Sequence, residues 1–356
     1  MTVQEVLHME KGSHIELPVV GWVEVMEVFP SYNRTVFLAR PVDAGPESAI
    51  VVKSFLLTNT ADPQQFITTI QGYFDKLRSY GVRVVHNIQF IQSHGDEGTV
   101  LIQTEKYVGP NLDQWIQKLS PAAGVGEIQN IIESVLTSCF LPLLKARLPE
   151  NGQPAERLSN RLEIGLDFLG RNIVCRKDSA QEYGWLAVYV DLMPAKLILG
   201  CGAHGLEVPE PQDPQVRKLG IFRHYNLAGL LIAFWCHLTK HRPEWGQLFF
   251  KAINRFLKNR ELDSVRSEIA GYMSDLGPRV KKLSSDQVHK LVSGWTFEDV
   301  FRFRILACQI ASFKEPSPPL ERAMSLLFSL THFQERPLEE DAIARAKKLI
   351  VELVEL

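Results

Sequence analysis

Short runs of apolar residues bounded by turn-forming residues fill the first hundred positions of the chain. Runs of this kind predict β-strands at residues 18–29, 35–39, 49–55, 84–92 and 99–104. Residues 62–80 differ, because apolar side chains recur there at three- and four-residue steps behind a capping Asp62 and a first-turn Pro63. The pattern therefore predicts a sheet with one helix inserted between its strands.

Helical periodicity dominates the chain after residue 112. It predicts helices at residues 113–119, 126–148, 225–239, 245–257, 262–273, 285–293, 297–313, 320–333 and 338–356. The segment 225–239 is apolar almost all round, which indicates a buried helix, whereas residues 200–223 contain Gly and Pro and predict an irregular loop. We therefore expect an α+β protein with a sheet-rich lobe over residues 1–104, a lobe boundary over 105–112 and a helical lobe over 113–356.

Residues 162–196 interrupt the helical region with two short apolar runs that predict a β-hairpin. Asp167 and Asn172 would lie on the loop that leads into the hairpin, and Asp191 on the loop that leaves it. Two carboxylates and an amide oxygen are hard ligands of the kind that Mg²⁺ accepts together with water and substrate phosphates. The pattern indicates phosphoryl transfer, although Asp and Asn are also common in turns for their local hydrogen bonds alone.

Composition and charge narrow the class of protein. With 356 residues and 45% hydrophobic content, the chain can bury a sizeable core. A formal net charge of −2 and a pI near 6.6 give no global basic field, so we expect no nucleic-acid or membrane partner. The five scattered cysteines form no C-x-x-C pair, as is typical of reduced thiols, and no signal-peptide or membrane-spanning run is visible, which together predict a cytoplasmic protein.

Four motifs follow one another along the chain: Ala-Ile-Val-Val-Lys at 49–53, Thr-Glu-Lys-Tyr-Val-Gly-Pro-Asn-Leu at 104–112, Gly-Leu-Asp-Phe-Leu-Gly-Arg-Asn at 165–172 and Val-Asp-Leu-Met at 190–193. Their order resembles the lysine strand, hinge, catalytic loop and metal-binding segment of the protein-kinase-like superfamily. The resemblance is greatest to its small-molecule branch, the aminoglycoside phosphotransferase and choline kinase type. It covers roughly residues 20–240 and implies a two-lobed protein-kinase-like fold.

The resemblance implies phosphorylation of a small-molecule hydroxyl by ATP with magnesium, the nucleotide lying between the lobes. Asp167 would be the catalytic residue that accepts or orients the hydroxyl proton, and Asn172 and Asp191 would hold Mg²⁺. The residues implied in binding the nucleotide are Lys53 on its phosphates and the hinge residues Glu105 and Tyr107 near adenine.

Several positions depart from the family pattern. Residues 30–34 lack the glycines of a kinase phosphate loop, and Gly165 stands where the family has histidine. The helix at 62–80 contains no glutamate, which leaves Asp75, Gln71 or no residue to pair with Lys53. The alternative is thus a pseudokinase, a nucleotide-binding or partner-binding module without phosphotransfer, for which a protein partner is open.

His237 and His241 stand four positions apart at the end of the apolar helix, a spacing that could ligate zinc. The intervening Leu-Thr-Lys lacks the glutamate of a metalloprotease motif. We therefore interpret the two histidines as cationic side chains favoured at a helix C-terminus.

Overall fold

The structure is a computed structural model that describes residues 9–29, 35–57, 62–86, 89–95, 98–119, 125–150, 158–191 and 214–274, with residues 302, 304, 305 and 307–309. Its N-terminal part is a six-stranded antiparallel sheet with the spatial order β1 (His14–Leu17), β2 (Gly21–Phe29), β3 (Thr35–Pro41), β4 (Ile50–Leu57), β6 (Gly98–Lys106) and β5 (Gln89–Gly95). The predicted sheet is confirmed, and β1 is an addition that the apolar pattern did not reveal.

The two faces of this sheet bury different apolar clusters. One face carries a cluster that includes Val25, Phe37 and Ile102. The other face meets helix α2 (Pro63–Tyr80), where the rings of Phe55 and Phe66 lie 5.5 Å apart. The single predicted helix is therefore confirmed and covers one side of the sheet.

Local chemistry defines both ends of α2. The Asp62 side chain accepts a hydrogen bond from the Gln64 N–H at 2.9 Å, which caps the first turn. Gly81 ends the helix in the left-handed conformation with φ of 96°, which a glycine adopts without steric cost.

The second half of the chain is mainly helical. Its helices are α3 (Leu112–Lys118), α4 (Val125–Val135), α5 (Pro214–Tyr225), α6 (Leu227–His241), α7 (Gly246–Asn259) and α8 (Asp263–Ser274). Every residue from 227 to 239 is buried, as the all-round apolar pattern predicts. Helix α6 is therefore the central element around which this region packs.

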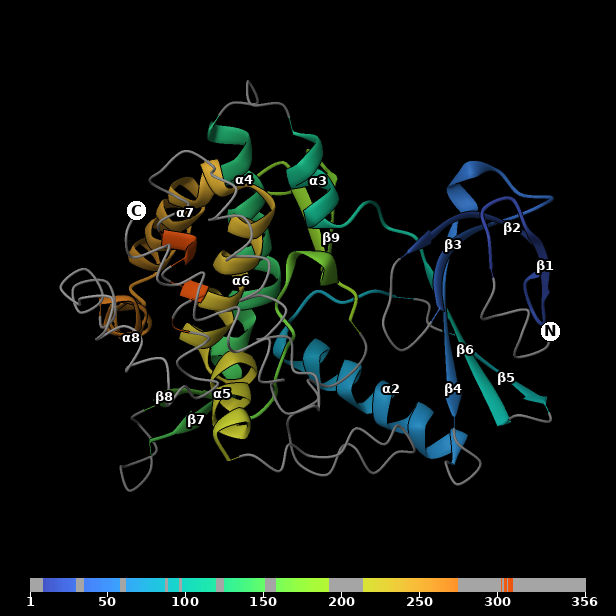
Figure 1. Ribbon diagram of the computed structural model, residues 1–356, viewed down its shortest axis with the longest axis horizontal. Helices are drawn as coiled ribbons and strands as arrows, with labels where there is room; N and C mark the ends of the chain where they lie inside the picture. The colour runs from blue at the N-terminus through green and yellow to red at the C-terminus, as the bar shows by residue number, and fades with distance from the viewer. Residues whose placement is uncertain are drawn as a thin grey trace, which may run out of the picture.

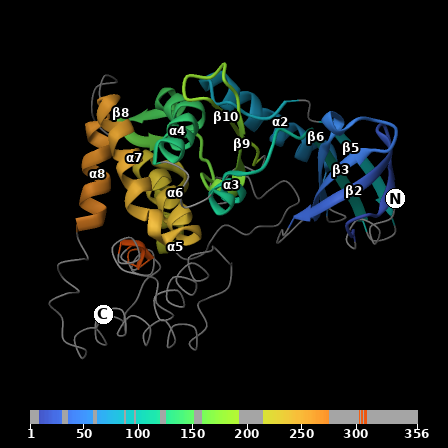
Figure 2. The same ribbon diagram turned by 90° about the horizontal axis from the view of Figure 1, so that it is seen from above.

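A short hairpin interrupts the helices, as predicted. Strands β9 (Ile173–Lys177) and β10 (Trp185–Tyr189) pair antiparallel, with Cys175 opposite Ala187. Figures 1 and 2 show the six-stranded sheet at one end of the molecule and α4 to α8 at the other, with α2 and this hairpin between them.

Three predicted boundaries are wrong. The helix expected at 126–148 leaves regular α geometry after Val135, passes through a π turn and a 3₁₀ turn that contains Pro142, and gives way to β7 (Arg147–Pro149), which pairs with β8 (Leu158–Leu162). The strand expected from Val84 starts at Gln89, because Val84 pairs with Tyr189 instead. Part of the expected loop at 200–223 is helix α5, while residues 200–213 lie outside the described residues.

The last predicted helices lie mostly outside the described residues. Those at 285–293, 320–333 and 338–356 fall outside entirely, and of 297–313 the described positions are helical.

Four cysteines, Cys139, Cys175, Cys236 and Cys308, are buried free thiols. Within the part of the chain that the structure describes, no helix has the length and apolarity needed to cross a membrane.

Candidate functional site

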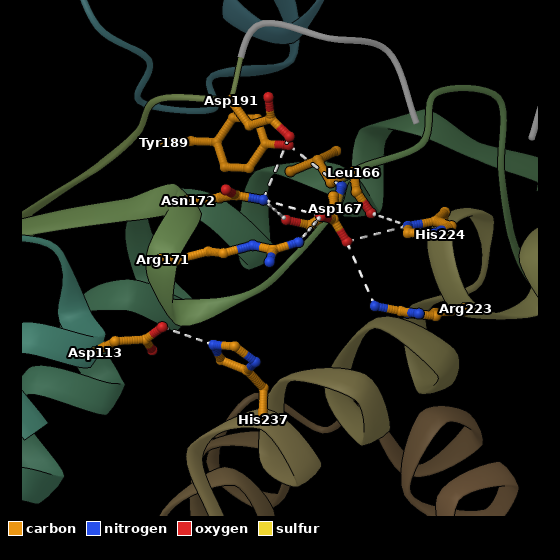
Figure 3. Close-up of polar contacts among 10 residues, drawn as sticks. All are labelled: Asp113, Leu166, Asp167, Arg171, Asn172, Tyr189, Asp191, Arg223, His224 and His237. Carbon is orange, nitrogen blue, oxygen red and sulfur yellow. Dashed lines mark hydrogen bonds and ion pairs between the residues drawn. The ribbon is translucent and has the colours of Figure 1, made fainter. Parts of the chain in front are cut away.

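Asp167, Asn172 and Asp191 meet at one end of the β9–β10 hairpin (Figure 3). The Asn172 Nδ2 donates to Asp167 Oδ2 at 3.1 Å and to Asp191 Oδ2 at 3.3 Å. Asn172 is buried, whereas the Asp167 side chain keeps 20% of its surface exposed. The three residues that the sequence predicts at this end of the hairpin are thus brought together, with a carboxylate accessible to a ligand.

Backbone and tyrosine contacts hold this group in place. The Val190 N–H donates to the Asn172 carbonyl at 2.9 Å, which ties the strand leading to Asp191 to the Gly170–Asn172 turn. The Asp167 N–H donates to the Tyr189 hydroxyl at 3.2 Å, and the Tyr73 hydroxyl of α2 donates to the Gly165 carbonyl at 2.8 Å. Burial raises the pKa of both Tyr73 and Tyr189 well above the usual value, so both phenols stay neutral.

Lys53 joins the sheet to the hairpin. Its Nζ lies 2.8 Å from Glu105 Oε1 and donates to the Val190 carbonyl at 2.8 Å, directly before Asp191. Both charged side chains are buried, at 5% and 3% exposure, and Gln103 Nε2 donates to the second Glu105 oxygen at 2.9 Å. A lysine is almost never buried without such a partner.

The partner of Lys53 corrects the expectation drawn from α2. Glu105 on the neighbouring strand β6 supplies the carboxylate, while Asp75 on α2 is exposed and pairs with Arg78 at 3.1 Å. The helix therefore needs no glutamate to neutralise Lys53. Gln71 is exposed as well.

Basic side chains surround Asp167. Arg171 Nη2 lies 3.5 Å from Asp167 Oδ2, and Arg223 Nη2 and His224 Nδ1 each lie 3.7 Å from Asp167 Oδ1. Burial would raise the pKa of Asp167, but His224, which is protonated at the low pH where this carboxylate titrates, and the charges of Arg223 and Arg171 lower it below its usual value. Asp167 is therefore a carboxylate at neutral pH.

The positive charge near Asp167 comes from the arginines at neutral pH. Burial lowers the pKa of His224 to about 4, against the attraction of Asp167. The ring is thus neutral at pH 7, and its Nδ1 donates to the Leu166 carbonyl at 3.0 Å. Burial also lowers the pKa of Arg223 to about 10, which leaves the guanidinium charged.

Tyr107 directly follows β6 and is hydrogen-bonded to the segment that leads into β4. Its N–H donates to the Ala49 carbonyl at 3.0 Å, so this amide already has a backbone partner directly before β4. Burial and the nearby Glu27 raise the pKa of its phenol, which stays neutral. The nucleotide-binding role of Tyr107 stays a prediction.

Gly165 and Tyr225 form a contact that the sequence did not reveal. A Cβ atom added at Gly165 would overlap the Tyr225 ring, so the ring fills the space that a side chain at position 165 would need. Tyr225 lies at the end of α5, sixty positions along the chain, and no periodic signal links the two.

Arg223, His224 and the contact between Asp113 and His237 were also missed. Arg223 and His224 lie on α5, which the Gly- and Pro-containing pattern did not predict. Asp113 and His237 are far apart in the sequence, although their side-chain atoms are 2.7 Å apart. Only the pair of histidines spaced by four positions was visible as a signal.

The group formed by Asp167, Asn172 and Asp191 can hold a cation, and that cation can bind an anionic ligand. The same group can orient a hydroxyl group. Carboxylates at Asp167 and Asp191 and the amide of Asn172 offer hard oxygen donors. Asp167 accepts hydrogen bonds in its ionised form.

No protein-family model matches the chain, and no curated protein matches its sequence.

Proposed function

We propose that the chain is a divergent protein-kinase-like phosphotransferase that transfers phosphate from ATP, with Mg²⁺, to a small-molecule hydroxyl. The observation that carries the proposal is the convergence of Lys53, Asp167, Asn172 and Asp191 from separate segments. Lys53 contacts the Val190 carbonyl, and Asn172 joins the carboxylates of Asp167 and Asp191. Turn chemistry explains each Asp and Asn singly but gives no reason for a buried lysine to join them.

The donor set fits a magnesium ion. Asp191 and Asp167 offer carboxylate oxygens, and Asn172 offers Oδ1 once its terminal amide rotates, since amide nitrogen and oxygen are nearly interchangeable in shape. Mg²⁺ held there would neutralise phosphate charge. Lys53, already fixed by Glu105, is placed to add a second positive charge beside the same segment.

Asp167 would orient the acceptor hydroxyl rather than act as a strong base. His224, Arg223 and Arg171 keep its pKa low, and a carboxylate of low pKa takes up a proton weakly. Phosphoryl transfer tolerates this, because positioning and electrostatic stabilisation supply most of its catalysis. The hydroxyl would donate a hydrogen bond to the exposed part of the Asp167 carboxylate.

A second candidate is a nucleotide-binding module without phosphotransfer. It is favoured by the pairing of Lys53 with Glu105 inside the sheet, since this pair needs no movement of α2 to form. A lysine held by a strand residue can bind the phosphates of a nucleotide in a protein that no longer catalyses phosphate transfer. The two candidates share the binding site and differ only in turnover.

Thermal unfolding with ATP and Mg²⁺ tests the site that both candidates share. A ligand that binds only the folded state adds about 2.7 kcal/mol of stability at one hundred times its Kd. We expect ATP with Mg²⁺ to raise Tm by several degrees. Asp191→Asn should remove most of the part of this Tm increase that depends on Mg²⁺.

The matched control is Asp75→Asn, which changes an exposed carboxylate of α2 and should keep the full shift. No shift with the unaltered protein would contradict both candidates. A shift without release or transfer of the γ-phosphate would favour the binding module.

A further inference from the structure

A second group of ligand-type side chains lies between α3 and α6, separate from the residues around Asp191. His237 Nε2 is 2.7 Å and His241 Nε2 is 3.4 Å from Asp113 Oδ2. One ligand atom from each residue lies within 4.8 Å of the other two. In Figure 3, Asp113 and His237 lie on the far side of Arg171 from Asp191.

The helices fix this geometry. Residues four apart share a helix face, so α6 presents both imidazoles on the side that faces α3. On α3, Asn111 caps the helix through a reciprocal pair of hydrogen bonds with Gln114, which sets the first turn that carries Asp113. Both rings therefore aim Nε2 at the same carboxylate oxygen.

The group is buried and its charge needs compensation. The side chains of Asp113 and His237 keep only 11% and 8% exposure, while His241 keeps 23%. Asp113 Oδ1 is buried and makes no hydrogen bond within the described residues. A buried carboxylate is costly unless a cation or several donors face it.

We propose that Asp113, His237 and His241 bind one divalent transition-metal ion, for which Zn²⁺ is the best match. Two imidazole nitrogens and a carboxylate oxygen are typical zinc ligands, and a water completes a four-coordinate site. At metal–ligand lengths of about 2.05 Å, tetrahedral ligand atoms stand about 3.3 Å apart. The 3.4 Å separation from Asp113 Oδ2 matches this spacing, and the 2.7 Å separation would lengthen by about 0.6 Å on metal binding.

Gln117 supplies the outer contact that such a site needs. Its terminal amide lies 3.0 Å from His241 Nδ1. With the amide oxygen turned toward the ring, Gln117 accepts the Nδ1–H and leaves the Nε2 lone pair for the metal. The His241 side chain keeps 23% exposure, so the ion and its water would enter the site from this side.

The ion would join α3 to the central helix and support the turn that carries Asn172. A Cβ atom at Gly170, in this turn, would overlap Asp113 Oδ1, so the carboxylate packs directly on the turn backbone. This role is structural and does not depend on the phosphotransferase proposal.

Zinc titration of the untagged, chelator-treated full chain tests the site. We expect one Zn²⁺ per chain by calorimetry and a rise in Tm on binding. His241→Gln should weaken binding at least about 100-fold, beyond the 10- to 100-fold losses that follow changes in outer contacts. His14→Gln and His86→Gln, which change exposed histidines outside α6, should bind as the unaltered protein does.

Two further variants keep the test decisive. Asp113→Asn should abolish the visible absorption of a four-coordinate Co²⁺ complex, while circular dichroism reports whether the variant folds. His241→Gln, at a partly exposed position, serves if Asp113→Asn does not fold. Asp191→Asn should keep full zinc affinity. The zinc test therefore stays valid even if Asp191 binds no magnesium.

Three results would overturn the proposal. Zinc binding that is equal in the unaltered protein and His241→Gln would exclude these ligands. Loss of binding in His14→Gln, His86→Gln or Asp191→Asn would place the ion elsewhere. Absence of stoichiometric binding to the unaltered, folded chain would exclude the site altogether.

Discussion

The charge state of Asp167 depends on side chains that the sequence did not connect with it. Arg171 and Arg223 keep the carboxylate ionised, while His224 is held neutral by burial and donates to the Leu166 carbonyl. A neutral, buried histidine makes the free energy of unfolding depend on pH, because the native packing requires the ring to stay unprotonated.

We predict that His224 destabilises the protein as the pH falls from 6.5 to 4. In this window the unfolded histidine takes up a proton but the folded one, with a pKa of about 4, does not. The unfolded state binds more protons, so the free energy of unfolding decreases as the pH decreases. At about 1.4 kcal/mol per pH unit, the loss at pH 4.5 is about 2–3 kcal/mol.

Urea unfolding of His224→Asn at pH 7 and pH 4.5 measures this contribution. Asparagine can still donate to the Leu166 carbonyl but does not titrate, so the variant should lose less stability by about that amount. His14→Asn, at an exposed position of β1, should behave as the unaltered protein does. The low pKa of Asp167 does not interfere, because the stability it adds is lost only below about pH 4. Equal pH dependence in His224→Asn and the unaltered protein would contradict the assignment.

At the scale of elements, strands β4 and β6 pair through a buried ion pair as well as through their backbones. Lys53 and Glu105 lie diagonally across β4 and β6 and are buried. Arg40 and Glu24 lie directly opposite each other on β3 and β2 and pair at 2.8 Å, but they keep 37% and 34% exposure. Removing one member of a buried pair leaves an uncompensated charge, but exposed pairs contribute little.

We predict unequal coupling in two double-mutant cycles measured by denaturant unfolding. Lys53→Met should cost about 3–5 kcal/mol, because Glu105 is left buried and unpaired. Adding Glu105→Gln should recover part of that cost, which gives a coupling energy of about 1–3 kcal/mol. The Arg40→Met and Glu24→Gln cycle should give about 0–1 kcal/mol. Equal coupling in the two cycles would mean that Lys53 and Glu105 do not act as a buried pair in solution.

The sequence predicts those elements whose signal is local. Helix α2 has a cap, a first-turn proline and an apolar stripe, and α6 is apolar all round, so both are found close to their observed bounds. The π turn after Val135 carries no such signal. Helix α5 carries none either, because it lies next to Gly- and Pro-rich residues and its apolar stripe is weak. Local pattern therefore reveals elements better than their ends.

Contacts between distant residues explain what the sequence could not reveal at the site. Asp167, Asn172 and Asp191 flank one hairpin, so their proximity follows from a local prediction. The partner of Lys53 and the contacts of Asp113 depend on which strand or helix lies alongside, which periodicity does not encode. Glu105 was therefore predicted for the hinge but not as the partner of Lys53.

At the scale of the whole molecule, the candidate site joins the sheet to the helical region. Lys53 and Glu105 come from the sheet, Tyr73 from α2, and Asp167, Asn172 and Asp191 from the loops around the hairpin. Any change in how the sheet sits on the hairpin would change the distance from Lys53 to Asp191. Phosphotransfer would be sensitive to it, because catalysis of this kind depends on positioning.

The release of γ-phosphate from ATP tests the central claim most directly. With Mg²⁺ and no added acceptor, water can replace the hydroxyl, and we expect a slow release that Asp167→Asn lowers by at least about 100-fold. Asp263→Asn, which changes a carboxylate that is 75% exposed at the start of α8, should release phosphate at the unaltered rate. Equal rates for the unaltered protein and Asp167→Asn, or no release from a protein that binds ATP, would contradict the phosphotransferase assignment.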